Sequence, residues 1–275
     1  MSPHFGHAEN RRLISIFRYR SKRLSMSVVH KIDCAHCGAP IQFNPGEILT
    51  TCRYCGFTQV IETGSAFTFA HSMFMNKYDS TSVENVVREW MRSGFAKPND
   101  LAKAAEITAK NLVYLPFWVL GVEASTAYEG IFERLTPPLL KKGEIRKNYD
   151  WLILARKATQ FPAREYDVPL EGKIPYDFRK IESFAKVLNS EIEKDVAVEK
   201  AQQQIEAHHQ FLAKQDVDRV VKISTDFKFG DSAYLHAPIW FIVYVYKGEN
   251  HQIILDGAAG MVIKGDIPAT RFGLF

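Results

Sequence analysis

All four cysteines of this 275-residue chain lie in one short stretch, as two C-x-x-C-G motifs. The motifs are Cys34-Ala-His-Cys37-Gly and Cys52-Arg-Tyr-Cys55-Gly, with fourteen residues between them. Each motif places two thiolates on one side of a tight turn, and the following glycine accepts the positive φ that the turn requires. Two such turns that face each other bring four sulfurs to the corners of a tetrahedron, the geometry that Zn²⁺ prefers. The spacing therefore predicts a zinc ion held by Cys34, Cys37, Cys52 and Cys55.

Other uses of the four cysteines are weaker. A disulfide pair needs an oxidising compartment, and nothing in the sequence marks a secreted chain. A redox C-x-x-C motif usually occurs once, at the N-terminus of a helix in a βαβ unit. An iron centre of the rubredoxin type uses the same spacing and stays open. His36 is expected to be an exposed residue of the first turn. Because four protein sulfurs leave no coordination position for water or substrate, the expected role of the metal is structural.

The cysteines define an expected module over residues 28–63. Strands are predicted at 39–43, at 48–51 as the returning strand after a turn at 44–47, and at 57–61. This layout resembles the four-cysteine zinc ribbons of archaeal and bacterial proteins. A module of about thirty residues has too little core to fold alone, so metal binding is expected to hold it together.

Composition and charge limit the function classes. With 46% hydrophobic and 24% charged residues, the chain is typical of a globular protein with room for two or three modules. The sequence has neither an apolar run of membrane-spanning length nor an apolar segment typical of a signal peptide. A cytoplasmic location is therefore expected, with the cysteines kept reduced for the metal.

Residues 1–27 are predicted to form a basic, disordered leader. Residues 1–31 carry seven Lys or Arg against Glu9 alone, whereas the net charge of the whole chain is +4. Residues 11–31 are an alternative nucleic-acid tail, because Lys and Arg displace the counterions of phosphate groups. The segment that begins at Met26 resembles the start of many zinc-ribbon proteins, which leaves open that residues 1–25 are an upstream extension of the reading frame.

The remaining chain predicts an α+β fold: a body of antiparallel β-meanders packed with helices, with units at 64–175 and 176–275. Helices are expected from Ser82, as N-cap, to Met91 and from Pro98 to about Lys110. A long helix is expected over 176–214, where Gly and Pro are missing and apolar residues recur every three or four positions. Residues 137–143 are expected to be a surface loop, and Gly230-Asp231 a turn. The other predicted elements are strands, at 112–128, 149–156, 217–229, 232–246, 251–256 and 261–264.

Two similar segments suggest an internal repeat. Tyr114-Leu-Pro-Phe-Trp118 and the segment from Tyr234 to Trp240 each follow helical sequence, so two helix-plus-meander repeats are predicted. The closing hairpin, around Asp256-Gly257-Ala-Ala-Gly260, is similar to the last hairpin of PepSY-like domains. With the ribbon, these features resemble a poorly characterised group of prokaryotic zinc-ribbon proteins. The resemblance implies metal binding and implies no reaction.

The sequence contains none of the common catalytic motifs, such as nucleotide-binding loops, a hydrolase nucleophile elbow or H-E-x-x-H. His208 and His209 are adjacent on a helix, cannot chelate one ion as an i, i+4 pair would, and are expected to be exposed. His71 and His236 are expected in turns or the core. The pair Asp256 and Asp266 is weak support for a carboxylate site, because Asp-Gly is typical of a turn. The tryptophans and strand tyrosines are expected in the core.

These observations predict a zinc-stabilised, non-enzymatic binding or adaptor protein that acts through macromolecular contacts. The expected contact residues in the ribbon are Arg53-Tyr54 and Thr58-Gln59. The alternative is a nucleic-acid- or ribosome-associated protein that uses the ribbon and residues 11–31. A second alternative is an enzyme with a site near His236 and Asp256.

Overall fold

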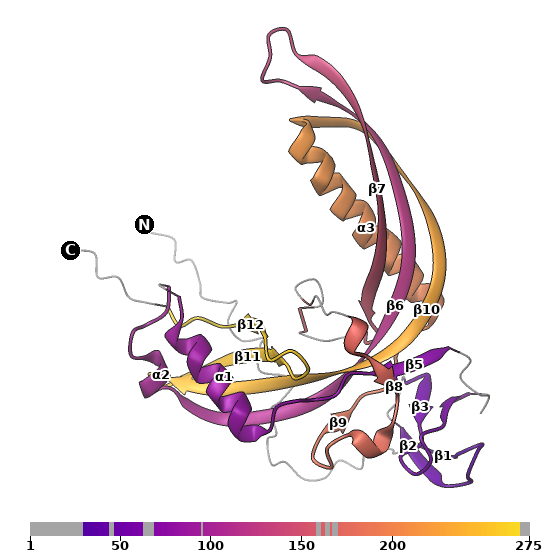
Figure 1. Ribbon diagram of the computed structural model, residues 1–275, viewed down its shortest axis with the longest axis vertical. Helices are drawn as coiled ribbons and strands as arrows, with labels where there is room; N and C mark the ends of the chain where they lie inside the picture. Colours follow the sequence, from indigo (N-terminus) through magenta and orange to yellow (C-terminus); the bar gives the residue numbers. More distant parts are fainter. Residues whose placement is uncertain are drawn as a thin grey trace, which may run out of the picture.

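The computed structural model describes residues 30–43, 47–62, 69–94, 96–157, 161–162, 166 and 170–269. The predicted leader, most of the basic stretch at 11–31, the turn at 44–46 and the boundary near residue 64 lie outside the described residues. The described chain has mixed α and β content in which strands dominate. Figure 1 shows a strongly curved sheet with the cysteine-bearing module at its outer bend. No helix in this part of the chain has the length and apolar character needed to cross a bilayer.

The cysteine-bearing module consists of two short antiparallel strand pairs. β1 (His30–Asp33) pairs with β2 (Pro40–Phe43), and β3 (Leu49–Thr51) pairs with β4 (Thr58–Val60). The three predicted strands are present, but the prediction that 48–51 returns along 39–43 is wrong. Each C-x-x-C turn instead joins the strands that flank it, so the two turns sit at corresponding ends of two separate hairpins.

The body is organised by two very long antiparallel strands, β6 (Glu106–Phe132) and β10 (Arg219–Tyr246). β7 (Leu139–Leu154) extends the sheet beside β6, and β11 (Glu249–Asp256) and β12 (Val262–Gly265) continue from β10 as a meander. Shorter strands complete it: β5 (Ala70–Met73), β8 (Ile174–Pro175) and β9 (Lys186–Val187).

Two predicted breaks in these strands are wrong. The register of β10 against β6 shifts between Phe229 and Ser232, so Gly230-Asp231 forms a bulge within one continuous strand. Residues 139–143, expected in a loop, belong to β7. The ladder to β6 continues on either side of Gly230-Asp231, and residues 139–143 are themselves paired with residues 128–132 of β6. Strand pairing therefore overrides the local turn propensity in both places.

The two similar Tyr-Leu segments pair with each other at the centre of the sheet. Tyr114 lies opposite Pro238, Pro116 opposite His236, and Trp118 opposite Tyr234. Pro116 fits this interior strand because β7 ends beside it, where Leu154 pairs with Phe117, so the ladder to β7 does not need the N–H that Pro116 lacks. The internal repeat remains a prediction.

Three α-helices are found in the described residues. α1 (Ser80–Arg92) begins one turn earlier than predicted, because Asp79 is the N-cap and its Oδ1 accepts from the N–H groups of Thr81 and Ser82. α2 (Leu101–Ala104) is much shorter than the predicted 98–110, since β6 starts at Glu106.

The prediction of one long helix over 176–214 is correct only for its second part. α3 spans Lys194–Asp216, whereas the preceding residues form a 3₁₀ turn (Phe178–Lys180), β9 and extended chain. Backbone groups here bond outside the segment: Leu188 N–H donates to Tyr114 O, and Glu191 N–H to Ala155 O. Hydrogen bonds to the sheet replace those of a helix, and periodicity alone does not reveal that competition.

The helices cover opposite arms of the curved sheet (Figure 1). Apolar residues of α1 pack with Trp240 and Tyr244, and those of α3 pack with Trp118 and Tyr234. The predicted core role of these aromatic residues is confirmed, because all four are at most 2% exposed. The ribbon lies on the outside of the bend, beside β5 and β8 (Figure 1).

Candidate metal centre

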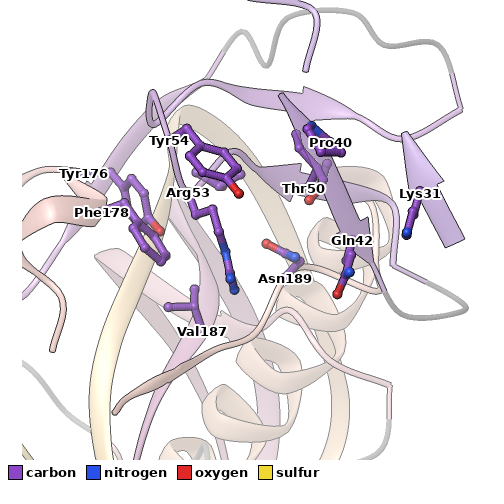
Figure 2. Close-up of a pocket in the computed structure, with 12 residues that line it drawn as sticks. Lys31, Pro40, Gln42, Thr50, Arg53, Tyr54, Tyr176, Phe178, Val187 and Asn189 are labelled. Carbon is purple, nitrogen blue, oxygen red and sulfur yellow. The ribbon is translucent and has the colours of Figure 1, made fainter. Parts of the chain in front are cut away.

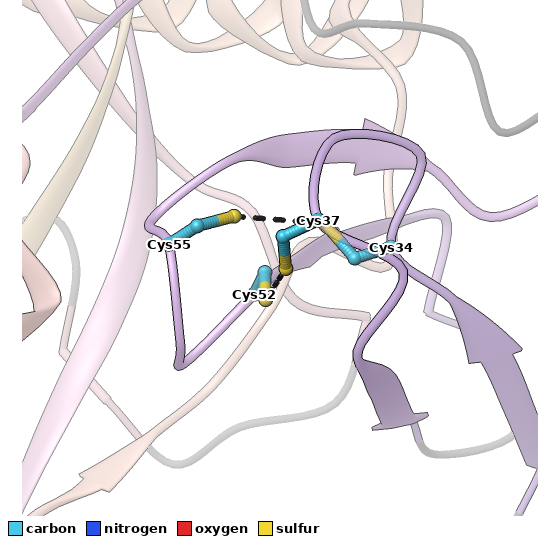
Figure 3. A group of neighbouring side chains, drawn as sticks. All are labelled: Cys34, Cys37, Cys52 and Cys55. Atoms are coloured by element: carbon cyan, nitrogen blue, oxygen red, sulfur yellow. Dashed lines mark hydrogen bonds between the residues drawn. The ribbon is translucent and has the colours of Figure 1, made fainter.

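The sulfur atoms of Cys34, Cys37, Cys52 and Cys55 all lie within 4.8 Å of one another. Figure 3 shows the four side chains converging from the two turns. Two edges of the cluster measure 3.6 Å (Cys34 Sγ to Cys55 Sγ) and 3.7 Å (Cys37 Sγ to Cys52 Sγ). A tetrahedral zinc site with Zn–S bonds of about 2.3 Å requires S–S edges of about 3.8 Å. The donor set therefore fits a tetrahedral four-thiolate metal ion.

The two turns have the same backbone geometry. Gly38 N–H donates to Cys34 O and Gly56 N–H to Cys52 O, both at 2.8 Å. The two glycines have φ of 70° and 76°, the left-handed region that a Cβ disfavours. The prediction that each C-x-x-C motif needs its following glycine is confirmed.

The four thiols do not ionise independently. Burial opposes ionisation of Cys34, but hydrogen bonds from the backbone N–H groups of Cys37 and His36 lower its pKa to about 7. Burial raises the pKa of Cys55 to about 12, and the neighbouring sulfurs add to this rise. Cys34 therefore ionises readily, whereas ionisation of Cys55 beside it is unfavourable. A divalent cation would stabilise the additional thiolates by its positive charge.

Gln59 connects the two hairpins and is not a contact residue. Its Oε1 accepts from Ala35 N–H at 2.8 Å, and its Nε2 donates to Asp33 O at 3.1 Å. The Gln59 side chain, which belongs to the second hairpin, thus fixes the position of the first cysteine turn. The prediction that Thr58 and Gln59 form an exposed contact surface is wrong, because they are 8% and 1% exposed. Arg53 and Tyr54 are exposed, as that prediction requires.

The ribbon is attached to the body by a buried polar junction. Ile48 N–H donates to Ser190 O at 2.9 Å, which joins the start of β3 to the chain before α3. The Glu47 carboxylate accepts from Asn189 Nδ2 at 3.1 Å and lies 3.5 Å from Arg156. Arg156 also pairs with Glu191 at 2.7 Å. These contacts fix the second cysteine turn relative to the sheet.

A hydrogen-bonded pair of histidines continues this junction into the sheet. His236 Nε2 lies 2.8 Å from Leu188 O, and His236 Nδ1 lies 2.9 Å from His71 Nε2. His71 Nδ1 in turn lies 3.1 Å from Thr58 Oγ1. Burial lowers the pKa of His236 to about 4. Burial, together with the neighbouring His236, lowers the pKa of His71 to about 2. Both rings are therefore neutral at pH 7.

Neutral rings give this chain of hydrogen bonds one direction. A carbonyl only accepts, so His236 Nε2 carries the proton and donates to Leu188 O. His236 Nδ1 then accepts from His71 Nε2, and His71 Nδ1 accepts from the Thr58 hydroxyl. The two histidines therefore act as connectors between β4, β5 and β10. No sequence signal indicated this pairing, because the residues are 165 positions apart.

The other predicted site residues do not form a catalytic group. Both ring nitrogens of His236 are engaged as described, while Asp256 Oδ1 accepts from Ala258 N–H. Asp266 Oδ2 accepts from Gln252 N–H. Between His236 and Asp256, and between the two aspartates, there is no hydrogen bond in the part of the chain that the structure describes. The second alternative, an enzyme at His236 and Asp256, gains no support from this geometry.

The prediction that both helix histidines are exposed is wrong for His209. Its ring is buried between Thr126 Oγ1, 2.6 Å from Nδ1, and the Tyr149 hydroxyl, 2.8 Å from Nε2. His208 is half-buried against Tyr149 and Trp151. α3 packs one face on the sheet, so adjacent histidines differ in burial as the helical period requires.

A groove lies where the ribbon meets the body, with a volume of about 240 Å³. Figure 2 shows Arg53 and Tyr54 of the second cysteine turn on one side. Tyr176, Phe178 and Asn189 of the body face them. The sequence indicated the ribbon side of this groove, but the body side comes from a segment that was predicted to be helical.

Comparisons of the chain with protein-family models, with curated proteins and with solved structures give no match.

Proposed function

We propose that this protein is a zinc-stabilised, non-enzymatic binding protein that recognises a macromolecule at the junction between its ribbon and its body. Four thiolates with tetrahedral spacing support a structural metal ion. The metal would fix the second cysteine turn, and that turn presents Arg53 and Tyr54 to solvent. The resemblance to prokaryotic four-cysteine zinc ribbons agrees with this role.

The observation that carries the proposal is the groove lined from both modules. Exposed side chains on a rigid metal-bound turn lose little conformational freedom when they bind a partner, which favours recognition. The buried contacts of Glu47, Thr58 and Gln59 explain why this turn is held firmly against the body. Arg53 and Tyr54, only one and two residues after Cys52, would therefore form the contact surface.

A capture experiment from native lysate tests the proposal. The full-length tagged protein is compared with the double variant Arg53→Gln/Tyr54→Ala, each with and without nuclease, followed by mass spectrometry. We expect a partner that the wild type retains and the double variant loses, while both proteins contain one zinc per chain. Equal recovery of every partner by the two proteins would contradict the proposed surface.

A further inference from the structure

The groove beside the ribbon is electropositive. Lys31 and Arg53 line it, and no acidic side chain does. Neither cation forms an ion pair within the described part of the chain, whereas the nearby carboxylates have partners: Glu47 bonds Asn189 and Arg156, and Asp177 bonds Arg179 at 2.9 Å. An unpaired cation pair beside neutralised acids favours an anionic ligand.

Two buried hydroxyls add hydrogen-bond donors to the same groove. Thr50 and Tyr176 line it, and their hydroxyl oxygens are buried and have no hydrogen-bond partner among the described residues. The Thr50 side chain is fully buried. Burial raises the pKa of Tyr176, so its hydroxyl keeps the proton that it can donate. Buried polar groups in native proteins normally have partners, and a ligand oxygen would satisfy these two.

Aromatic rings form the other component of the groove. Tyr54 is 66% exposed on the second cysteine turn. Tyr176 is held in place by stacking on His71, with ring centroids 4.0 Å apart. In Figure 2 the Arg53 side chain extends between Tyr176 and Phe178 on one side and Asn189 on the other. Asn189 Nδ2 donates a hydrogen bond to the Glu47 carboxylate, so Asn189 Oδ1 remains as an acceptor in the groove that Gln42 also lines.

We propose that the groove binds one nucleotide of a single-stranded nucleic acid, a ligand class that rests on the proposed binding function. Arg53 and Lys31 would contact the phosphate, and Tyr54 would stack on the base, as aromatic residues do on single-strand-binding surfaces. The amides of Gln42 and Asn189 offer both donors and acceptors to a base edge. An acidic peptide would satisfy the cations but would leave the exposed Tyr54 ring without a planar partner.

Fluorescence anisotropy with the full-length, zinc-loaded protein tests this proposal. The probes are a labelled 12-nucleotide oligothymidylate, the same strand with abasic positions, and a labelled poly-glutamate peptide, each at several salt concentrations. Tyr54→Ala should weaken oligothymidylate binding roughly 5- to 150-fold and have little effect on the abasic strand. Arg53→Gln should weaken both strands and make the salt dependence shallower by about one phosphate contact.

Two matched controls separate the contribution of the groove residues from the effect of removing any exposed cation or any exposed aromatic side chain. Arg146→Gln removes an exposed cation of β7 that pairs with Glu144, and Phe184→Ala removes an aromatic side chain that is 65% exposed outside the groove. Both should leave the affinity unchanged. Zinc content and circular dichroism of each variant report folding separately.

Each outcome distinguishes this ligand class from the binding function itself. No binding of oligothymidylate by the wild type at low salt, or equal losses in the controls, would overturn the nucleic-acid proposal. If the peptide binds instead, or if the lysate partner survives nuclease and is lost in the Arg53/Tyr54 variant, the binding function stands and its ligand is a protein. If neither probe nor partner depends on Arg53 and Tyr54, both proposals fail.

Discussion

The ribbon and the body bury very different amounts of apolar surface. The ribbon's own cluster of buried residues consists of Cys34, Ile41 and Cys52, and two of these are expected metal ligands. The largest cluster of the body contains fifteen buried residues from α1, α2 and several strands of the sheet. The body can therefore fold on hydrophobic burial, whereas we expect the ribbon to depend on a metal and on its attachment to the body. The contacts at Glu47 and His236 join the cysteine-bearing ribbon to the hydrophobic core of the body.

The largest expected effect breaks the ribbon and spares the body. Chelation of the metal, or Cys52→Ser, removes an interaction of about 10–16 kcal/mol in model peptides. Hydrogen exchange should then show loss of protection over residues 34–60, while β6 and β10 keep their protected amides. Unchanged protection around the cysteines after chelation, with zinc absent by elemental analysis, would contradict the metal-dependent ribbon.

The second-largest expected effect destabilises the body and leaves the ribbon's metal site intact. Trp240 is 1% exposed in the body core, and Trp240→Ala should lower the free energy of unfolding by about 3–5 kcal/mol. Urea denaturation measures this loss, and the variant should still bind one zinc under native conditions. Phe211→Ala, at a site that is 59% exposed, is the matched control and should change stability by less than about 0.5 kcal/mol.

The third effect is a pH dependence of the junction. The pKa of His236 is lowered to about 4 by burial, so below its unfolded value of about 6.5 the unfolded chain binds more protons than the folded one. Stability is then full above pH 6.5 and falls as the pH drops toward 4, by on the order of 3 kcal/mol. Denaturation at pH 7.5, 6 and 5 should show a slope to which His71, whose pKa is also lowered by burial, adds with the same sign, and His236→Gln should reduce the slope. A slope that is identical in the variant would place its origin elsewhere.

The smallest effect concerns the buried carboxylate of the junction. Glu47→Gln weakens the contacts to Arg156 and Asn189, although Arg156 keeps Glu191, so we expect a loss of about 1–3 kcal/mol. Thermal unfolding measures it. Glu144→Gln, which breaks the exposed pair with Arg146, should cost less than about 1 kcal/mol. Equal effects of the two changes would show that the junction contributes no more than a surface ion pair.

Most of the candidate metal centre could be predicted from the sequence. Its ligands follow from local spacing, since a C-x-x-C-G turn forms within five residues and needs only its own backbone hydrogen bonds. For the same reason, the Lys247-Gly248 turn and the meander of β11 and β12 appear where they were predicted. The groove could not be predicted, because half of it comes from residues 176–189, whose periodicity is typical of a helix.

Local chemistry in the sequence determined the two cysteine turns, which sulfurs converge and which aromatic residues leave water. Only the tertiary structure decided that the two Tyr-Leu segments pair with each other, that His71 meets His236, and that the chain before α3 bonds to the sheet and to the ribbon. The physical reason is that these contacts join residues far apart in sequence. Backbone donors and acceptors there are satisfied equally well in a helix or in a sheet, and the packing of the whole body selects between them.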